Sequence, residues 1–201
     1  MPLIETAAAF LLLWAVIGYL LGSIPFGLLL TRALGLGNLR EIGSGNIGTT
    51  NVLRTGSKAA AAATLILDGG KGAAAVLLAR SLAGEDAAQL AGLMAFLGHC
   101  FPVWLKFQGG KGVATFLGLM LAMAWPVGIA CCLTWIATAA VSRISSLSAL
   151  VAALAAPLWA YLLGYPAVVL LAGLLAVIVF WRHAANISRL LAGREPRIGQ
   201  K

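Results

Sequence analysis

Long apolar runs that alternate with short polar stretches are the main pattern along this chain. Residues 7–30, 59–79 and 167–181 consist mostly of Ala, Leu, Val, Ile, Gly and aromatic residues. A helix of about 20 such residues crosses about 30 Å of hydrocarbon, and these runs approach or exceed that length. We therefore predict an all-α, polytopic integral membrane protein.

Seven membrane-spanning helices are predicted from this pattern. They lie near residues 7–31, 57–80, 87–105, 110–123, 126–141, 147–163 and 166–183. Pro126 and Pro166 mark two of the turns. The first run has no basic segment before it and no small-residue cleavage site after it, so we expect a retained span rather than a signal peptide. We expect residues 1–201 to form a single transmembrane domain.

Composition agrees with a membrane location. Hydrophobic residues make up 61% of the 201 residues, charged residues make up only 10%, and the mean hydropathy is +0.98. These values lie outside the range of ordinary soluble domains.

The charges divide between the two sets of connections that seven spans create. One set holds the basic residues Arg32, Arg40, Arg54, Lys58, Lys106, Arg143, Arg182, Arg189, Arg194, Arg197 and Lys201. The other set holds Glu5, Glu85 and Asp86, with Arg80 at its border. The positive-inside rule then places the N-terminus outside and the C-terminus in the cytoplasm. The net charge of +8 is thus mainly a topology signal, with attraction to anionic headgroups or anionic substrates as a second use. Scattered basic residues without an aromatic platform argue against nucleic-acid binding.

Neither a metal site nor a cofactor is expected. Cys100, Cys131 and Cys132 lie in apolar surroundings without a CxxC pair, which indicates buried, inert thiols. His99 and His183 have no carboxylate near them in the sequence, which argues against a metal centre.

Four polar clusters fall on the predicted cytoplasmic side of the membrane. They are residues 43–54, 98–112, 142–148 and 182–190. Because these clusters share one face of the predicted bundle, we expect the functional site there.

The first cluster contains Gly43, Gly45 and Gly48 in the spacing GxGxxG. A dinucleotide site needs this motif between a strand and a helix, whereas a membrane helix precedes it here, so that interpretation fails. Glycines still let backbone N–H groups converge on an anion, and a following helix N-terminus adds partial positive charge. Further donors in the cluster are Ser44, Thr49, Thr50 and Arg54. The alternative is a flexible polar linker between two spans.

The tetrapeptide GGKG occurs twice, at residues 69–72 and 109–112. Lys111 of the second copy opens a span at the cytoplasmic surface, where we expect it to reach a soluble substrate. Asp68 and Lys71 lie within the second apolar run, three residues apart on one helix face. Two interpretations stay open for this pair: an ion pair at a broken or kinked helix, or direct contact with substrate.

Both histidines lie at cytoplasmic helix ends. For His183, the neighbouring Arg182 and Asn186 on the same helix face favour a role at the site. His99 is a possible site residue that could equally be structural. Further hydroxyl donors on this side are Ser145 and Ser146.

Five segments resemble, in order and spacing, the PlsY family of bacterial acyl-phosphate:glycerol-3-phosphate acyltransferases. They are GSIPFG at 22–27, GSGNIGTTNVLRTGSK at 43–58, LDGGKG at 67–72, GHCFPVWLKFQGGKGVAT at 98–115 and RHAANISRLLAGREPRIG at 182–199. The resemblance covers essentially the whole chain. It departs from the commonest family pattern at Thr49, at Gln108 and at Ala184 with Ala185.

The resemblance implies transfer of a fatty acyl group from an acyl phosphate, not acyl-CoA, to the 1-hydroxyl of sn-glycerol 3-phosphate. The products would be lysophosphatidic acid and phosphate, made at the bacterial inner membrane by a site facing the cytoplasm. By motif, the implied substrate-binding residues are Gly43, Ser44, Gly45, Asn46, Thr50, Arg54, Lys111, Ser145, Ser146, His183 and Asn186. The implied catalytic residues among them are Ser44, Arg54, Lys111, His183 and Asn186.

The sequence favours direct transfer over an acyl-enzyme. Soluble-type glycerophosphate acyltransferases depend on a histidine followed five positions later by an aspartate, but Trp104 and Ser188 stand at that distance here. Ser44 has no base evident from the sequence. We therefore expect the glycerol hydroxyl to attack the acyl phosphate in a cationic site that holds both substrates. The resemblance implies a substrate phosphate as the proton acceptor.

A membrane transporter for an anionic phosphorylated solute is the alternative function. It could use glycine-bearing helices and the intramembrane Lys71. A transporter should carry its polar residues near the midplane, whereas here they gather on one side. A non-enzymatic assembly subunit would leave the four polar clusters unexplained.

Overall fold

The computed structural model describes residues 2–199, and all regular structure in that range is helical. The α-helices are α1 (Ala8–Gly22), α2 (Phe26–Ala33), α3 (Thr49–Leu53), α4 (Lys58–Ala83), α5 (Glu85–Cys100), α6 (Val113–Met123), α7 (Trp125–Ser142), α8 (Ser145–Leu162), α9 (Pro166–Arg182) and α10 (Ala184–Leu191). A short 3₁₀ helix, η1 (Val103–Leu105), lies between α5 and α6.

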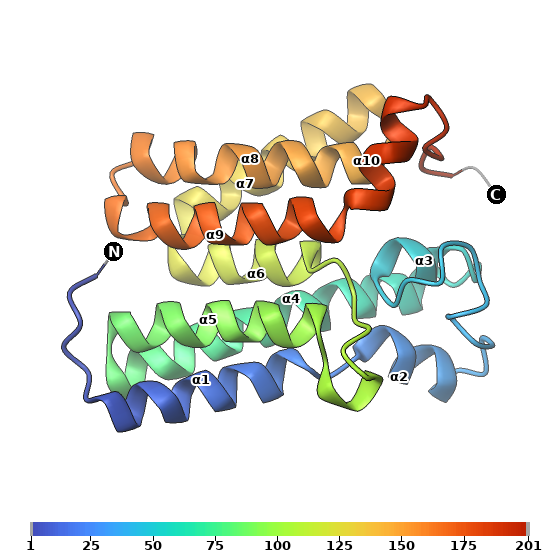
Figure 1. Cartoon of the computed structure of the whole chain (residues 1–201). Coiled ribbons are helices and arrows are strands. Elements are labelled where there is room, and N and C mark those ends of the chain that lie inside the picture. The colour runs from blue at the N-terminus through green and yellow to red at the C-terminus, as the bar shows by residue number, and fades with distance from the viewer. Residues whose placement is uncertain (1, 200–201) are drawn as a thin grey trace.

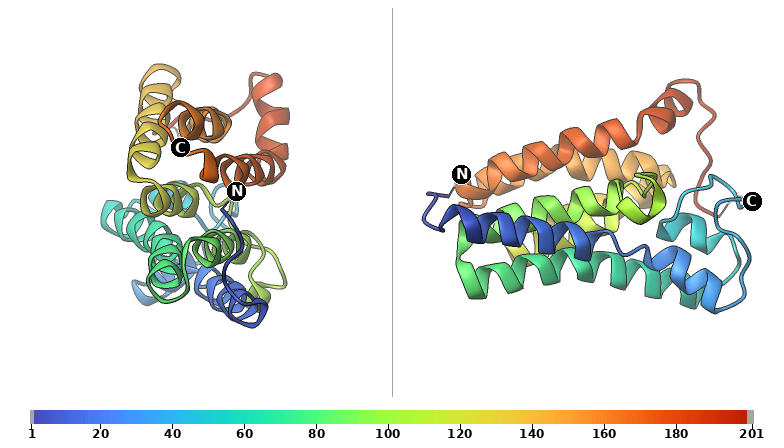
Figure 2. Two further views of the ribbon diagram at one scale, coloured as in Figure 1. Left: turned by 90° about the vertical axis from the view of Figure 1, so that its left-hand side faces the viewer. Right: turned by 60° about the horizontal axis from the view of Figure 1, so that its bottom comes forward.

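The long helices run along one common axis and form two groups with α6 between them (Figures 1 and 2). The first group contains α1, α2, α4 and α5, and the second contains α7, α8, α9 and α10. Helix α6 packs on α4 of the first group and on α7 of the second. The polar segments that follow these helices are thereby brought to one end of the bundle (Figure 1).

The first predicted span is broken between α1 and α2. Pro25 has no N–H to donate and disfavours helical conformation in the residue before it, which ends the helix. The carbonyl of Ser23 accepts a hydrogen bond from Trp104 Nε1 at 2.9 Å, and that of Ile24 accepts one from Lys71 Nζ at 2.7 Å. The expectation of one continuous helix was therefore wrong, and side chains from two other segments stabilise the break.

Small residues set the distance between the long helices. A side chain on Gly18 or Gly22 of α1 would collide with the backbone of Ala91 or Ala95 in α5. In the same way, Gly118 of α6 lies directly against the backbone of α4. Close packing of small residues is typical of membrane helices. In lipid the hydrophobic effect does not drive helices together, so their association depends on close van der Waals contact.

Helix α4 continues without interruption through Gly69 and Gly70. The break that one of the two interpretations placed at the first GGKG is therefore absent. The place where a Gly69 side chain would stand lies 3.3 Å from the Ala114 carbonyl oxygen, so Gly69 provides close contact with α6. A continuous helix also keeps its own backbone N–H groups hydrogen-bonded.

The helices confirm a multi-pass, all-α membrane protein. Five segments are long and apolar enough to cross a membrane: Ala8–Ala33, Lys58–Ala83, Glu85–Leu105, Trp125–Ser142 and Ser145–Leu162. A sixth is added if α9 and α10, which meet at a bend of 65°, count as one span. Helix α6 is about 16 Å long, half the thickness of the hydrocarbon. The number seven depends on α6 and stays a prediction.

The charged residues separate to the two ends of the bundle. At the end that carries the turns before α5, α7 and α9, Arg80 pairs with Glu85 at 2.8 Å, and Asp86 accepts a hydrogen bond from Thr6 Oγ1 at 2.6 Å. The opposite end carries α2, α3, the 101–112 segment and α10 (Figure 1). The basic Lys201 lies outside the described residues.

Candidate functional site

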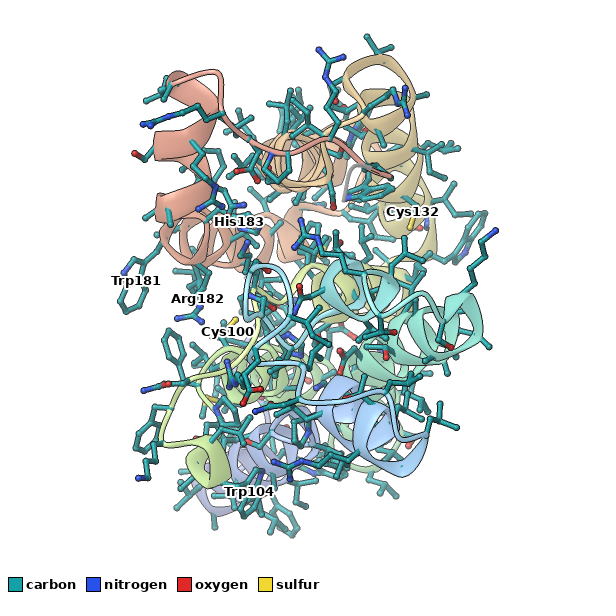
Figure 3. The ribbon with its side chains drawn as sticks, turned by 90° about the vertical axis from the view of Figure 1, so that its right-hand side faces the viewer. Cys100, Trp104, Cys132, Trp181, Arg182 and His183 are labelled. Carbon is teal, nitrogen blue, oxygen red and sulfur yellow. The ribbon has the colours of Figure 1, made fainter. Side chains whose placement is uncertain are left out.

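The four predicted polar clusters meet at one end of the bundle, onto which Figure 3 looks. The contributing elements are α3 with the loop before it, the 101–112 segment, the start of α8, and the junction of α9 with α10. Two groups of hydrogen-bonded side chains build this end, one around Asn51 and one around Glu195. Neither of these two residues was predicted from the sequence.

Asn51 organises the glycine-rich loop. Its side chain is buried, and Nδ2 lies within 3.0 Å of the carbonyl oxygens of Leu39, Ile42 and Asn46. Its Oδ1 accepts hydrogen bonds from the Ser44 N–H at 3.1 Å and from Arg54 Nη1 at 3.2 Å. One amide therefore fixes the loop backbone and also orients the guanidinium of Arg54.

The glycines allow the tight path of this loop. Gly43 and Gly45 have φ of +54° and +66°, in the left-handed region that favours glycine. The N–H of Gly45 donates to the Ile42 carbonyl at 2.9 Å, and that of Gly48 donates to Asn46 Oδ1 at 3.0 Å. These two N–H groups are therefore engaged within the loop.

Three of the predicted residues stand exposed at the rim of this end: Ser44, Thr50 and Arg54. Thr50 Oγ1 lies 3.3 Å from Ser145 Oγ at the start of α8, which joins α3 to the second helix group. The first and third polar clusters are thus in direct contact.

Glu195 forms the centre of the second hydrogen-bonded group. Its Oε1 accepts hydrogen bonds from Ser146 Oγ at 2.7 Å and from Asn186 Nδ2 at 2.5 Å. Its Oε2 accepts a hydrogen bond from Arg189 Nε at 2.6 Å. Asn186 Oδ1 in turn accepts one from Lys111 Nζ, also at 2.5 Å. The carboxylate therefore joins α8, α10 and the second GGKG segment.

The charge states in this group follow from its burial. Desolvation lowers the pKa of Lys111 to about 8; the Glu195 carboxylate opposes this shift, and the nearby arginines Arg189, Arg54 and Arg182 add to it. Burial raises the pKa of Glu195, but hydrogen bonds from Asn186, Ser146 and Arg189 outweigh that effect and hold the pKa below its ordinary value. A permanent carboxylate thus lies beside a lysine that titrates near physiological pH.

His183 lies in the bend between α9 and α10 and is buried. Its Nδ1 lies 2.8 Å from the carbonyl oxygen of Val179, to which it donates when protonated there. This contact fixes the ring and leaves Nε2 available as the second polar atom of the imidazole. His183 and Asn186 are the buried part of the site (its floor), whereas Ser44, Thr50 and Arg54 are its exposed part (its rim).

Asp68, Lys71 and His99 form a separate buried cluster. Lys71 Nζ lies 2.8 Å from Asp68 Oδ1 and donates to the Ile24 carbonyl, so its ammonium is engaged by α4 and by the helix break. His99 Nδ1 lies 3.7 Å from the same Asp68 oxygen, too far for a hydrogen bond. These contacts favour the structural ion pair over direct substrate contact. They also remove the intramembrane lysine as support for a transporter.

A sequence signal for Glu195 existed. It is the only acidic residue after Asp86, and it stands among basic residues of the C-terminal segment. A single carboxylate in a strongly cationic region needs a specific partner set. Asn51 gave no such signal, because the sequence does not show whether an asparagine side chain is buried or exposed.

Among the residues that the structure describes, no group of three or more His, Cys, Asp and Glu side chains is arranged to hold a metal ion. Around the Glu195 carboxylate and the Asn51 amide, the site gathers cations, amides and hydroxyls, which are donors for phosphate oxygens. Phosphate groups are the kind of ligand that such a donor set fits.

Comparison with known proteins agrees with this chemistry. A model of the glycerol-3-phosphate acyltransferase family matches residues 12–193. A glycerol-3-phosphate acyltransferase of Ruegeria sp. (strain TM1040) is 75% identical over 201 residues, which is 100% of each chain. That of Ruegeria pomeroyi is 69% identical over 201 residues, covering 100% of this chain and 99% of the relative.

Two solved structures have the same fold. Both are crystal structures of PlsY (YgiH), an integral membrane glycerol 3-phosphate acyltransferase. Its glycerol 3-phosphate form matches with a TM-score of 0.89 and 38% identity, over 94% of this chain and 96% of that chain. Its lysophosphatidic acid form matches with a TM-score of 0.86 and 36% identity, over 94% and 95%. In sequence and in structure, therefore, the chain belongs to the glycerol-3-phosphate acyltransferase family.

Proposed function

We propose that this protein transfers a fatty acyl group from an acyl phosphate to the 1-hydroxyl of sn-glycerol 3-phosphate. The products are lysophosphatidic acid and inorganic phosphate, and the reaction is the first acylation of phospholipid biosynthesis. The observation that carries the proposal is the hydrogen bond between Lys111 and Asn186 from distant segments, with Arg54 close enough to act on the Lys111 charge, at one end of a membrane bundle. Membership of the glycerol-3-phosphate acyltransferase family supports the acceptor.

The proposed site lies at the cytoplasmic face of the bacterial inner membrane. Seven spans place the N-terminus outside and the C-terminus inside, which puts the cationic end in the cytoplasm. An acyl phosphate then keeps its tail in the bilayer and its head at the surface. Glycerol 3-phosphate arrives from the aqueous side, so both substrates meet without removal of the acyl chain from the membrane.

The proposed substrate-binding groups divide between floor and rim. Arg54 offers two N–H groups to phosphate oxygens, and Lys111 offers a point charge. The other groups of the proposed set are Gly43, Ser44, Gly45, Asn46, Thr50, Ser145, Ser146, His183 and Asn186. Of these, Gly45 shapes the loop, because its N–H is bonded to the Ile42 carbonyl. Holding two anions among fixed donors lowers the entropy cost of the reaction and stabilises charge on the departing phosphate.

The proposed chemistry is a direct transfer. The glycerol 1-hydroxyl oxygen forms a bond to the acyl carbonyl carbon, the bond between that carbon and the phosphate oxygen breaks, and a phosphate oxygen takes the hydroxyl proton. The contacts of Ser44 support this route, since within residues 2–199 its hydroxyl contacts only Asn51, at 3.5 Å, and no histidine or carboxylate. A serine without a base is a poor nucleophile.

Purified protein with palmitoyl phosphate and glycerol 3-phosphate tests the proposal. We expect lysophosphatidic acid and phosphate in equal amounts, and no product from palmitoyl-CoA. Arg54→Ala and Lys111→Ala should each lower kcat/KM by about 100-fold or more, since each removes a charged donor of the reacting groups. Arg32→Ala and Lys58→Ala, at exposed positions of the same end, serve as matched controls. Near-normal activity in both site variants would refute the assignment.

A further inference from the structure

Arg182 is a basic residue of this end that the proposed substrate-binding set does not use. It is the last residue of α9, and Figure 3 shows it extending from α9 toward the region of Cys100. Its Nε donates to the Gly110 carbonyl and its Nη2 donates to the Gly109 carbonyl, each at 3.1 Å. A planar guanidinium can make two such bonds with fixed geometry, whereas an ammonium cannot.

The same two glycines are held from their other side by α5. The N–H of Gly109 donates to the Cys100 carbonyl at 3.1 Å, and that of Gly110 donates to the His99 carbonyl at 3.0 Å. A side chain on Gly109 would strike these carbonyl oxygens, and one on Gly110 would strike the His99 ring. Each glycine is therefore bonded by its N–H to the first helix group and by its carbonyl to the second.

The guanidinium itself is held in place by aromatic rings. It lies 5.0 Å from the centre of the Phe101 ring, a favourable position for a cation. Phe101 also contacts Trp181 at 5.4 Å, and its carbonyl accepts a hydrogen bond from Tyr19 at 2.7 Å. The orientation of Arg182 is thus determined before any substrate binds.

The backbone position of Lys111 depends on this arginine. Lys111 directly follows Gly110, and Asn186 lies four residues after Arg182, beyond the bend between α9 and α10. We propose that Arg182 is a positioning residue: its bonds to Gly109 and Gly110 set where the Lys111 ammonium lies relative to Asn186. This inference rests on the proposed function, in which Lys111 holds a substrate phosphate.

Arg182→Lys is the primary test, because it keeps the positive charge but removes the planar guanidinium that donates to both glycine carbonyls. We expect kcat/KM for glycerol 3-phosphate to fall by about 10-fold to 100-fold, chiefly through a higher KM, since small displacements of a binding group have effects of this size. In a Lys111→Ala background the same change should alter kcat/KM less than about 2-fold, because the arginine acts through that lysine. Arg32→Lys, an exposed arginine of the same end, is the matched control and should leave activity unchanged.

A multiplicative loss in the double variant would overturn the proposal, because Arg182 would then act independently of Lys111. An unchanged kcat/KM in Arg182→Lys would overturn it as well. If Arg182→Lys does not fold, as judged by its elution and thermal unfolding in detergent, Phe101→Leu replaces it. That variant keeps the arginine but removes its aromatic support, and a smaller loss of the same kind, again absent without Lys111, supports the proposal. No loss overturns it.

A second readout does not depend on activity. The reaction of the Lys111 amine with a small methylating reagent, followed by mass spectrometry across a pH series, reports its titration. Glu195, Arg189, Arg54 and Arg182 are the charged groups that act on this amine. A shift in the pH midpoint of Lys111 methylation in Arg182→Lys supports the positioning role. Absence of lysophosphatidic acid would refute the proposed function but would leave this support intact. An unchanged midpoint in an active protein overturns the positioning role.

Discussion

At the scale of single residues, Lys111 has the most consequential environment. Desolvation lowers its pKa to about 8, so the ammonium that would face a phosphate is present below that pH and lost above it. Phosphate groups are already dianionic in this range, because their second pKa is about 6. We therefore expect kcat/KM to fall as pH rises through about 8, and measurement of initial rates from pH 7 to 10 would show it.

Lys111→Arg supplies the control for this pH dependence. Arginine stays charged throughout the range, so its residual activity should lose the alkaline decrease. Bound phosphate favours the ammonium, so the decrease in kcat should come at higher pH than that in kcat/KM. An alkaline decrease that persists unchanged in Lys111→Arg would mean that another group causes it.

At the scale of elements, the loop before α3 depends on one buried amide. Asn51→Ala removes a donor to three backbone carbonyls. The Ile42 carbonyl keeps its bond from the Gly45 N–H, but the carbonyl of the buried Leu39 loses its side-chain donor, at about 1–3 kcal/mol for a buried group left unsatisfied. We expect faster amide hydrogen exchange across residues 38–54 and a higher KM for glycerol 3-phosphate, because Arg54 loses its orienting contact. The rest of the bundle should exchange as before.

Asn38→Ala is the matched control for the Asn51 variant. Asn38 lies in the same loop but is exposed, and its side chain bonds only to Glu41 and to the Arg40 N–H. Its loss should change neither exchange nor KM. Equal exchange in both variants would show that the buried amide does not organise the loop.

The helices also show which features of the fold could be predicted from the sequence alone. Apolar runs predicted the long helices well, since about 20 apolar residues have few alternatives in a membrane. The break at Pro25 was missed because its stabilising partners, Trp104 and Lys71, come from distant segments. One interpretation of Gly69 and Gly70 was a break in the helix, which is absent; the contact of Gly69 with α6 depends on packing that the sequence does not show.

The site shows the same division between local and long-range information. The motifs predicted which side chains gather, and Lys111 and Asn186 are in contact as the shared face implied. They did not predict the groups that hold these side chains in place, namely Asn51, Glu195 and Arg182. Such residues act through hydrogen bonds across the chain, and a single sequence carries no periodic signal for them.

At the scale of the whole molecule, the number of membrane crossings decides which side the site faces. An odd number places the two termini on opposite sides. With α9 counted as a span, the number is odd only if the short helix α6 also crosses. Glu5→Cys and Arg194→Cys, made singly, place an accessible thiol at each end of the chain. With an impermeant maleimide on intact spheroplasts, we expect labelling of the first and no labelling of the second until the membrane is permeabilised.

The parent protein is the control for this labelling, because Cys100 and Cys131 are buried and Cys132 is half-buried within α7. Labelling of both variants from outside would require an even number of crossings. In that case α6 and the Lys111 segment would form a re-entrant hairpin, and the basic residues gathered at the site would no longer follow from the positive-inside rule. Labelling of the second variant alone would show that the C-terminal end, and with it the site, faces outward, away from cytoplasmic glycerol 3-phosphate. Only the first pattern lets a substrate anchored in the inner leaflet and a soluble one reach the same cations.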